Sequence, residues 1–136
     1  MTTKLKQLKG LQDRLEKATG NLDDWNPYDT GNYFTSGEIR RWSDALFKSS
    51  LYPGTNETLL RNALKGSVDA TLALVERLLP GVTIILRTYT VDSHVEIIPM
   101  GHPVTAAFCA HAPTVALAIL RALIAALIAQ VEAKHV

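Results

Sequence analysis

Residues 82–100 read VTIILRTYTVDSHVEIIPM, and this stretch decides the fold. β-branched and aromatic side chains dominate its first half, which predicts a strand over residues 82–91. Asp92-Ser93 is typical of a turn, and a second strand is expected over residues 94–100. Residues 84–86, Ile-Ile-Leu, are apolar on both faces of their strand, which favours a sheet that is covered on both sides.

Helical periodicity surrounds this hairpin. Leucines at helical spacing predict a helix over residues 4–18. A long apolar run after Pro113 predicts a last helix that ends near residue 133, since proline suits the first turn of a helix. Residues 101–112 lie between the hairpin and this helix and are expected to form a loop.

Two further helices are expected in the middle of the chain. Thr35 and Glu38 have the spacing of a capping box, which predicts a helix over residues 37–48. Ser67 is placed to cap a helix over residues 68–79. The leucine period continues through residues 57–79, so a single helix over that range is the alternative.

These elements predict an α+β protein, a small antiparallel sheet sandwiched by α-helices. The chain has 136 residues, enough for a single domain over 1–136 with its own core. Its net charge of +1 indicates neither a nucleic-acid polymer nor an anionic membrane as partner. One cysteine excludes an internal disulfide, and the charged N-terminal stretch carries no apolar signal run, so a cytoplasmic protein is expected.

The apolar run near the C-terminus permits two interpretations. Between residues 115 and 129 only Arg121 is polar, but the run is shorter than the roughly 20 residues that span a bilayer. We therefore expect no membrane segment. A helix that is apolar nearly all round needs cover on all sides, which predicts a homo-oligomer. The expected interface residues repeat like a coiled-coil seam and are Leu117, Leu120, Ile124, Leu127 and Val131.

Three segments resemble the phage αβα-sandwich family of bacteriophage and prophage proteins. They are residues 15–20 (LEKATG), residues 67–75 (SVDATLALV) and residues 112–122 (APTVALAILRA). The resemblance covers about half of the chain, and the chain departs from the family's pattern after Gly20. It implies a small α+β sandwich of viral origin with no established chemistry, in the cytoplasm of an infected bacterial host, and it lends no site residues.

No catalytic motif is found in the sequence, and no enzyme is expected. Cys109 and His111 are close in the chain, but a nucleophile and its base seldom meet at this spacing in a loop. His94, Glu96, His102 and His111 do not have the i, i+4 or other tight spacing of known metal sites. We therefore expect no metal and no cofactor.

The most distinctive segment is an irregular, aromatic-rich insert at about residues 21–56. Seven of the nine aromatic residues lie between Trp25 and Tyr52. Aromatic rings together with arginines at helix starts are suited to a nucleotide, which offers a base to stack on and a phosphate to bind. The alternative is that Trp42 and Phe47 belong to the core and the tyrosines anchor a loop. The candidate ligand-binding residues are Trp25, Tyr28, Tyr33, Arg40, Arg41, Tyr52, Thr55, Asn56 and Arg61.

The function expected from these features is non-enzymatic binding by a phage-encoded, oligomeric protein. Its ligand is expected to be a small nucleotide signal, sequestered to counter the host's antiviral defence. The first alternative is a protein-protein interaction through the aromatic insert. The second is a structural or assembly accessory of the phage.

Overall fold

A computed structural model describes residues 3–18, 34, 36–47, 53–99 and 107–133. Five helices and three strands occur in this part of the chain, which confirms the α+β class. In chain order they are α1 (Thr3–Lys17), α2 (Ser36–Leu46), α3 (Pro53–Leu64), α4 (Val68–Leu78), β1 (Thr83–Thr88), β2 (Ser93–Ile98), β3 (Phe108–Ala112) and α5 (Val115–Ala133).

The sheet has three antiparallel strands in the order β1-β2-β3. The predicted hairpin is confirmed as β1 and β2, which pair from Thr83 with Ile98 to Thr88 with Ser93. The predicted loop over residues 101–112 is wrong at its C-terminal end, because Phe108–Ala112 forms β3 and pairs with β2. Phe108 is the only residue of a strand-favouring type in Phe108–Ala112, so this strand depends mainly on its pairing with β2.

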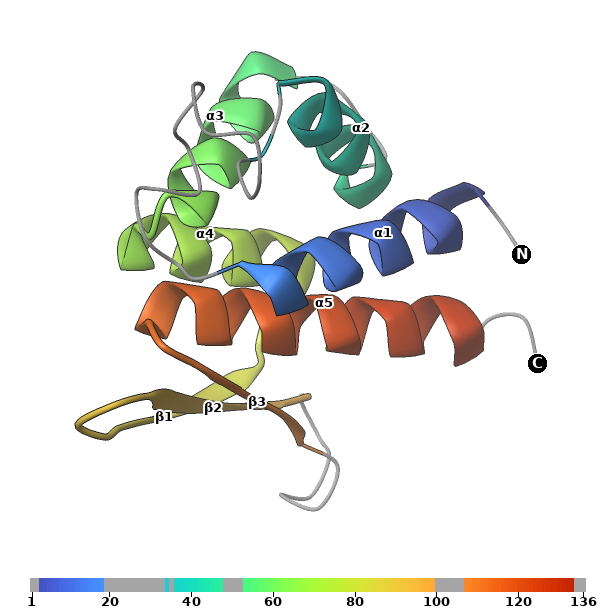
Figure 1. Ribbon diagram of the computed structural model, residues 1–136. Coiled ribbons are helices and arrows are strands. Elements are labelled where there is room, and N and C mark those ends of the chain that lie inside the picture. The colour runs from blue at the N-terminus through green and yellow to red at the C-terminus, as the bar shows by residue number, and fades with distance from the viewer. Residues whose placement is uncertain (1–2, 19–33, 35, 48–52, 100–106, 134–136) are drawn as a thin grey trace.

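The described helices all lie on one side of the sheet, with α5 directly against it (Figure 1). α5 packs on β2 and β3, and α1 and α4 pack on α5 in turn. The expected cover of both sheet faces is therefore not found among the described helices. β1 is an edge strand, and its apolar residues 84–86 are only partly buried.

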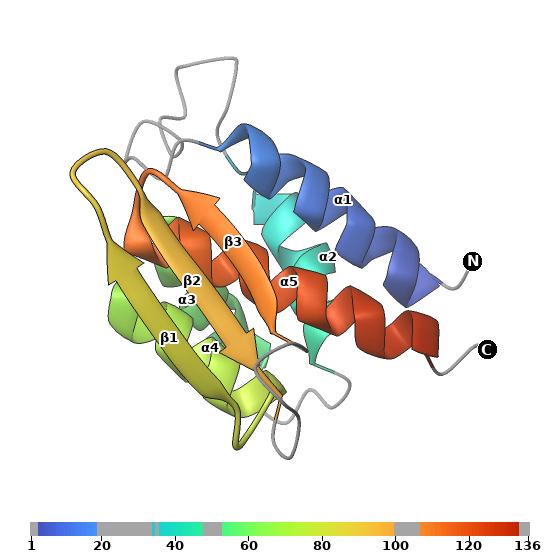
Figure 2. The same ribbon diagram turned by 90° about the horizontal axis from the view of Figure 1, so that it is seen from below.

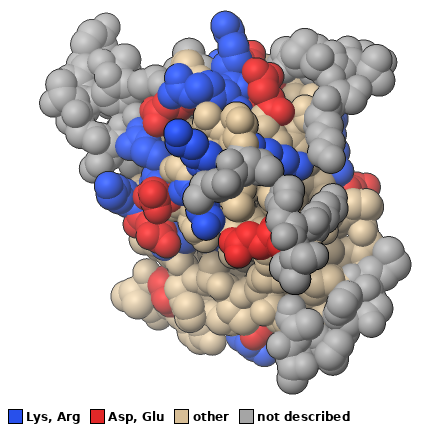
Figure 3. Space-filling model, turned by 90° about the vertical axis from the view of Figure 1, so that its right-hand side faces the viewer, with Lys and Arg blue, Asp and Glu red and all other residues tan. Residues whose placement is uncertain are grey.

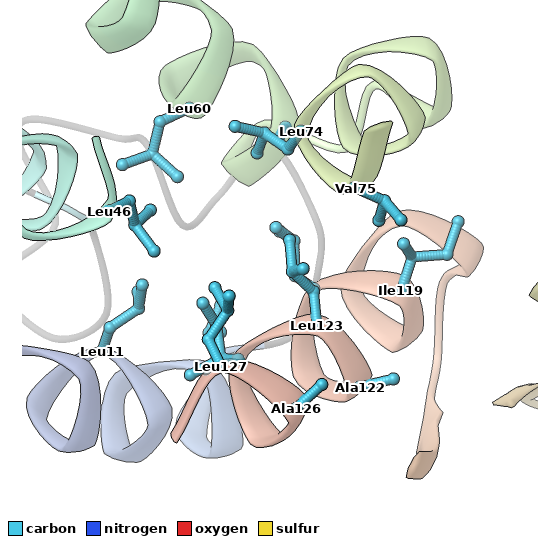
Figure 4. Packing of buried hydrophobic residues seen from close by; sticks show 14 of the residues in the cluster. Leu11, Leu46, Leu60, Leu74, Val75, Ile119, Ala122, Leu123, Ala126 and Leu127 are labelled. Atoms are coloured by element: carbon cyan, nitrogen blue, oxygen red, sulfur yellow. The ribbon is translucent and has the colours of Figure 1, made fainter. Parts of the chain in front are cut away.

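Helix α5 is the centre of the hydrophobic core. Leu123 is fully buried and points, with Ile119 and Leu127, toward side chains of the surrounding helices (Figure 4). The five residues expected to form an oligomer interface are buried within the single chain, so they offer no surface to a partner. These residues are Leu117, Leu120, Ile124, Leu127 and Val131.

By length and composition, α5 is also the one described helix that could cross a membrane. In this fold 67% of the tested window is buried inside the chain, as in the core helix of a globular domain.

The break between α3 and α4 settles the alternative that the sequence left open. Gly66 has a φ of 106°, a left-handed conformation that favours glycine and ends a helix. The Ser67 hydroxyl then accepts a hydrogen bond of 3.2 Å from the backbone N–H of Ala70, which confirms the predicted N-cap. Residues 57–79 therefore belong to two helices.

Candidate metal centre on the open face of the sheet

One face of the sheet packs on the core and the other carries polar side chains. On β2 the side chains of Val95 and Ile97 are fully buried toward the helices. Because successive side chains of a strand point to opposite faces, His94 and Glu96 project to the other side. We call this second side, which none of the described helices covers, the open face (Figure 1).

The register of the sheet brings the polar residues of three strands together on the open face. His94 of β2 is paired with Arg87 of β1 and with His111 of β3. Glu96, two residues further along β2, is paired with Cys109. Residues paired in an antiparallel sheet have neighbouring side chains on the same face, so these five side chains form one cluster.

The two histidines lie between two carboxylates. His94 Nδ1 and His111 Nε2 are 2.9 Å apart. The other ring nitrogen of His94, Nε2, is 3.2 Å from Glu96 Oε1. The other ring nitrogen of His111, Nδ1, is 3.3 Å from Asp92 Oδ2. Hydrogen-bonding atoms thus form a continuous row from Asp92 through both rings to Glu96.

Glu96 is held as a carboxylate. Its hydrogen bond with His94 lowers its pKa below the usual value for a glutamate, and the charge of Arg87 acts in the same direction. Arg87 Nη1 donates to Glu96 Oε1 over 3.3 Å. The Glu96 side chain is 17% exposed and that of His94 14%, so both are restrained by their neighbours but reachable from solvent.

Three of these side chains have the arrangement of a metal-ion site. Ligand atoms of His94, Glu96 and Cys109 all lie within 4.8 Å of one another. Ligands around a tetrahedral zinc ion are roughly 3.5 Å apart, given bonds of about 2.0–2.3 Å. The site would close by a side-chain movement of about 1 Å, and Cys109 is exposed and has space to move.

The same geometry disfavours a cysteine nucleophile. A catalytic histidine uses one ring nitrogen for the thiol and the other for an orienting group. Both ring nitrogens of His94 already face other partners, His111 and Glu96. In this geometry the ring nitrogen that a Cys109 nucleophile would need faces Glu96 instead.

The cluster had a signal in the sequence that the prediction of a loop concealed. His94 and Glu96 are two residues apart, as are Cys109 and His111. In a loop this spacing carries no geometric meaning, but in paired strands it places all four side chains on one face. His102, which was considered with this group, lies outside the described residues.

The structure describes five of the nine residues predicted for the nucleotide site. Trp25, Tyr28, Tyr33 and Tyr52 lie outside the described residues. Thr35 of the predicted capping box also lies outside the described residues.

The three arginines predicted for the nucleotide site do not share one environment. Arg40 Nε lies 3.1 Å from Glu57 Oε1, although the Arg40 side chain is largely exposed. Arg41 is exposed and lines a surface hollow of about 460 Å³ together with Asp44. Arg61 is half-buried on α3.

Thr55 and Asn56, which were also predicted for the nucleotide site, differ in burial. Asn56 is buried and its side-chain oxygen accepts a hydrogen bond from Arg77, so this amide is already used inside the fold. Thr55 is exposed.

The alternative that aromatic residues of the insert belong to the core is confirmed for Trp42 in particular. Trp42 is buried and meets the ring of Phe34 edge-on, with centroids 5.8 Å apart. Phe47 is only partly buried against the same core. On the face seen in Figure 3, positive and negative side chains are mixed over the helical layer, so no extended positive patch for an anion is evident there.

The chain matches no protein-family profile, and no curated protein or solved structure is similar to it. The resemblance to the phage αβα-sandwich family therefore stays a prediction, as do the nucleotide ligand and the cytoplasmic location.

Proposed function

We propose that this protein binds one divalent transition-metal ion of the zinc class on the open face of its sheet. The proposed ligands are His94, Glu96 and Cys109. The observation that carries the proposal is the convergence of an imidazole, a carboxylate and a thiol from two paired strands, with all ligand atoms within 4.8 Å.

The chemistry of the three ligands selects the kind of ion. Calcium and magnesium prefer an all-oxygen shell, so a site with nitrogen and sulfur disfavours them. A thiolate with an imidazole and a carboxylate suits Zn²⁺ or its spectroscopic substitute Co²⁺. Three protein ligands leave one coordination position for water or another small ligand.

His111 supports the proposed site without being counted among its ligands. When His94 binds a metal through Nε2, its Nδ1–H can donate to His111 Nε2, which lies 2.9 Å away. His111 Nδ1–H can in turn donate to Asp92. Partners of this kind fix the orientation and tautomer of a metal-binding histidine.

The proposed role is binding rather than catalysis, as the sequence also led us to expect. Arg87 holds Glu96 in place by an ion pair when no metal is bound. A bound cation competes with this guanidinium for the same carboxylate, which weakens binding. The site therefore suits an ion that exchanges rather than one that is held permanently.

Titration of the protein with Co²⁺ tests this function directly. A cobalt–thiolate bond gives a near-ultraviolet charge-transfer band, and a tetrahedral site gives intense visible bands. We expect both bands to saturate at one ion per chain and to disappear on addition of excess Zn²⁺. Cys109→Ser should abolish the charge-transfer band.

His94→Gln and Glu96→Gln should weaken Zn²⁺ binding by more than the roughly 10–100-fold typical of losing an outer partner. Glu132→Gln is the matched control for Glu96→Gln, because Glu132 is an exposed glutamate paired with Lys9. It should leave binding unchanged. Stoichiometric binding that survives all three ligand substitutions, or no saturable cobalt spectrum at all, would refute the proposal.

A further inference from the structure

Arg87 borders the proposed metal site from the strand that supplies none of its ligands. Figure 2 looks onto the open face and shows β2 between β1 and β3. His94 is paired with Arg87 on one side and with His111 on the other. Because the proposed ligands lie on β2 and β3, the guanidinium of Arg87 approaches them from β1.

One carboxylate oxygen connects this guanidinium with the proposed ion. Glu96 Oε1 accepts a hydrogen bond of 3.3 Å from Arg87 Nη1 and lies 3.2 Å from His94 Nε2. An ion bound to this oxygen and to the ring nitrogen has bonds of about 2.0–2.2 Å. With the side chains in place, such an ion lies within roughly 5.5 Å of Arg87 Nη1, the combined length of one such bond and the hydrogen bond.

Metal binding uses the charge that balances Arg87. In the part of the chain that the structure describes, Glu96 is the one acidic side chain that pairs with Arg87. The Glu96 carboxylate and the Cys109 thiolate together neutralise a divalent ion. Asp92, the other acidic residue of the cluster, faces His111 at the far end of the row. The positive charge of Arg87 is therefore left on the β1 side of the loaded site without a carboxylate of its own.

The Arg87 side chain is free to turn toward the open coordination position. It is 54% exposed, whereas the Glu96 side chain is 17% exposed. Two cations at one carboxylate oxygen repel each other, and the more exposed one moves away more easily. A guanidinium matches the two oxygens of a carboxylate, with charge-assisted bonds of about 2.7–2.9 Å. Arg87 is thus a donor next to the position that three protein ligands leave on the ion.

We propose that the metal-loaded protein binds a small carboxylate, with one oxygen on the ion and the other hydrogen-bonded to Arg87. This inference rests on the proposed function and names the ligand of the fourth coordination position. The adjacent guanidinium favours an anion over a neutral ligand such as water. A carboxylate is favoured over a halide, because only a ligand with two oxygens can contact the ion and the guanidinium together.

The carboxylate and the metal ion should strengthen each other's binding. In the metal-free protein Arg87 is paired with Glu96 and competes with a cation for it. A carboxylate that binds the guanidinium removes this competition. Coupling between two ligands is reciprocal, so acetate should tighten metal binding by the same factor by which the metal tightens acetate binding.

Titration of the Co²⁺-loaded full chain with acetate tests the proposal. Sodium perchlorate keeps the ionic strength constant and gives the reference spectrum, since perchlorate is a poor metal ligand. We expect the visible cobalt bands to shift and to saturate at one acetate per ion. The cobalt–thiolate band should persist throughout, because acetate occupies the fourth position and does not displace Cys109.

Substitutions of Arg87 assign the second contact. Arg87→Gln should weaken acetate binding about tenfold or more, the effect of one lost arginine–carboxylate contact. Without acetate, the same variant should bind Co²⁺ more tightly than the wild type, because no guanidinium competes for Glu96. Arg87→Lys keeps the charge without the planar fork, so its acetate affinity should lie between the two. Arg40→Gln is the matched control, an exposed arginine paired with Glu57, and should bind acetate as the wild type does.

The outcomes separate this proposal from the metal site on which it rests. A protein with no saturable cobalt–thiolate spectrum in perchlorate refutes both. A normal cobalt spectrum that acetate leaves unchanged, or equal acetate affinities of the wild type and Arg87→Gln, overturns the carboxylate site alone. Loss of the cobalt–thiolate band on addition of acetate also overturns it, since acetate would then extract the ion instead of completing its coordination.

Discussion

Arg121 of α5 donates a hydrogen bond from Nε to the backbone carbonyl of Leu15, 3.0 Å away, at the end of α1. The same guanidinium donates to the carbonyls of Glu16, Ala18 and His111. The last carbonyls of a helix lack hydrogen-bond donors within the helix, and the Arg121 guanidinium donates to them. Burial lowers the pKa of Arg121, but an arginine keeps its charge throughout the physiological range.

Replacing Arg121 with methionine should destabilise the fold although it makes the helix more apolar. A hydrogen bond to a charged group contributes about 1.5–3 kcal/mol, and the bonds made by one guanidinium are not additive, so we expect a total loss of about 2–4 kcal/mol. Urea unfolding followed by circular dichroism measures it. Arg40→Met is the control, because an exposed ion pair contributes no more than about 1 kcal/mol. Equal stabilities of the two variants would contradict the capping role.

His111→Ala should weaken Zn²⁺ binding by about 10–100-fold without changing its stoichiometry. The reason is that His111 orients the His94 ring from outside the proposed ligand set. Competition with a fluorescent zinc chelator measures the affinity, and the cobalt–thiolate band should persist at saturating ion. A loss of affinity as large as that of His94→Gln would instead make His111 a direct ligand.

The nucleotide hypothesis can be tested on the candidate arginines that the structure describes. Arg40→Ala, Arg41→Ala and Arg61→Ala should each reduce nucleotide affinity about tenfold, the effect of one lost arginine–phosphate contact. Calorimetric titration with a panel of mono-, di- and cyclic nucleotides provides the measurement. Lys65→Ala, at an exposed residue that directly follows α3, is the control. If all three arginine variants bind as the wild type does, the phosphate contacts lie elsewhere.

Trp42 in α2 and Phe47 just after α2 should contribute differently to the stability of the fold. Trp42 is buried, so Trp42→Ala should cost about 3–5 kcal/mol. Phe47 is only partly buried, and Phe47→Ala should therefore cost less. Thermal melts of the two variants at equal concentration compare them. A larger loss for Phe47→Ala would mean that it is buried by residues outside the described part.

The fold was predictable from the sequence where a local pattern and the tertiary environment favour the same structure. The hairpin has β-branched residues and a turn, and α5 has an apolar run that begins beside a proline. The Ser67 cap also depends on neighbours in the chain. β3 has no such local pattern, because Cys109, Ala110 and His111 become a strand only by pairing with β2.

The candidate site was missed for the same reason. His94 and Cys109 approach each other through pairing between strands that are separated by residues 99–107, and no periodicity within one segment encodes that distance. The burial of α5 was misjudged in a related way. The apolar surface on nearly all sides of α5 was taken as a sign of a partner chain, whereas α1, α4 and the sheet of the same chain cover that surface.

The central position of α5 has a consequence for biosynthesis. α1 and α5 lie side by side although they are at opposite ends of the described chain (Figure 1). While the ribosome adds residues before Val115, the leucines of α1 and the inner face of the hairpin have no α5 to pack on. Vectorial synthesis therefore leaves the nascent chain without the centre of its core until α5 has left the exit tunnel. Folding is completed after that point, and stop codons or proteolytic cuts upstream of α5 yield chains that are substrates for chaperones rather than partly active proteins.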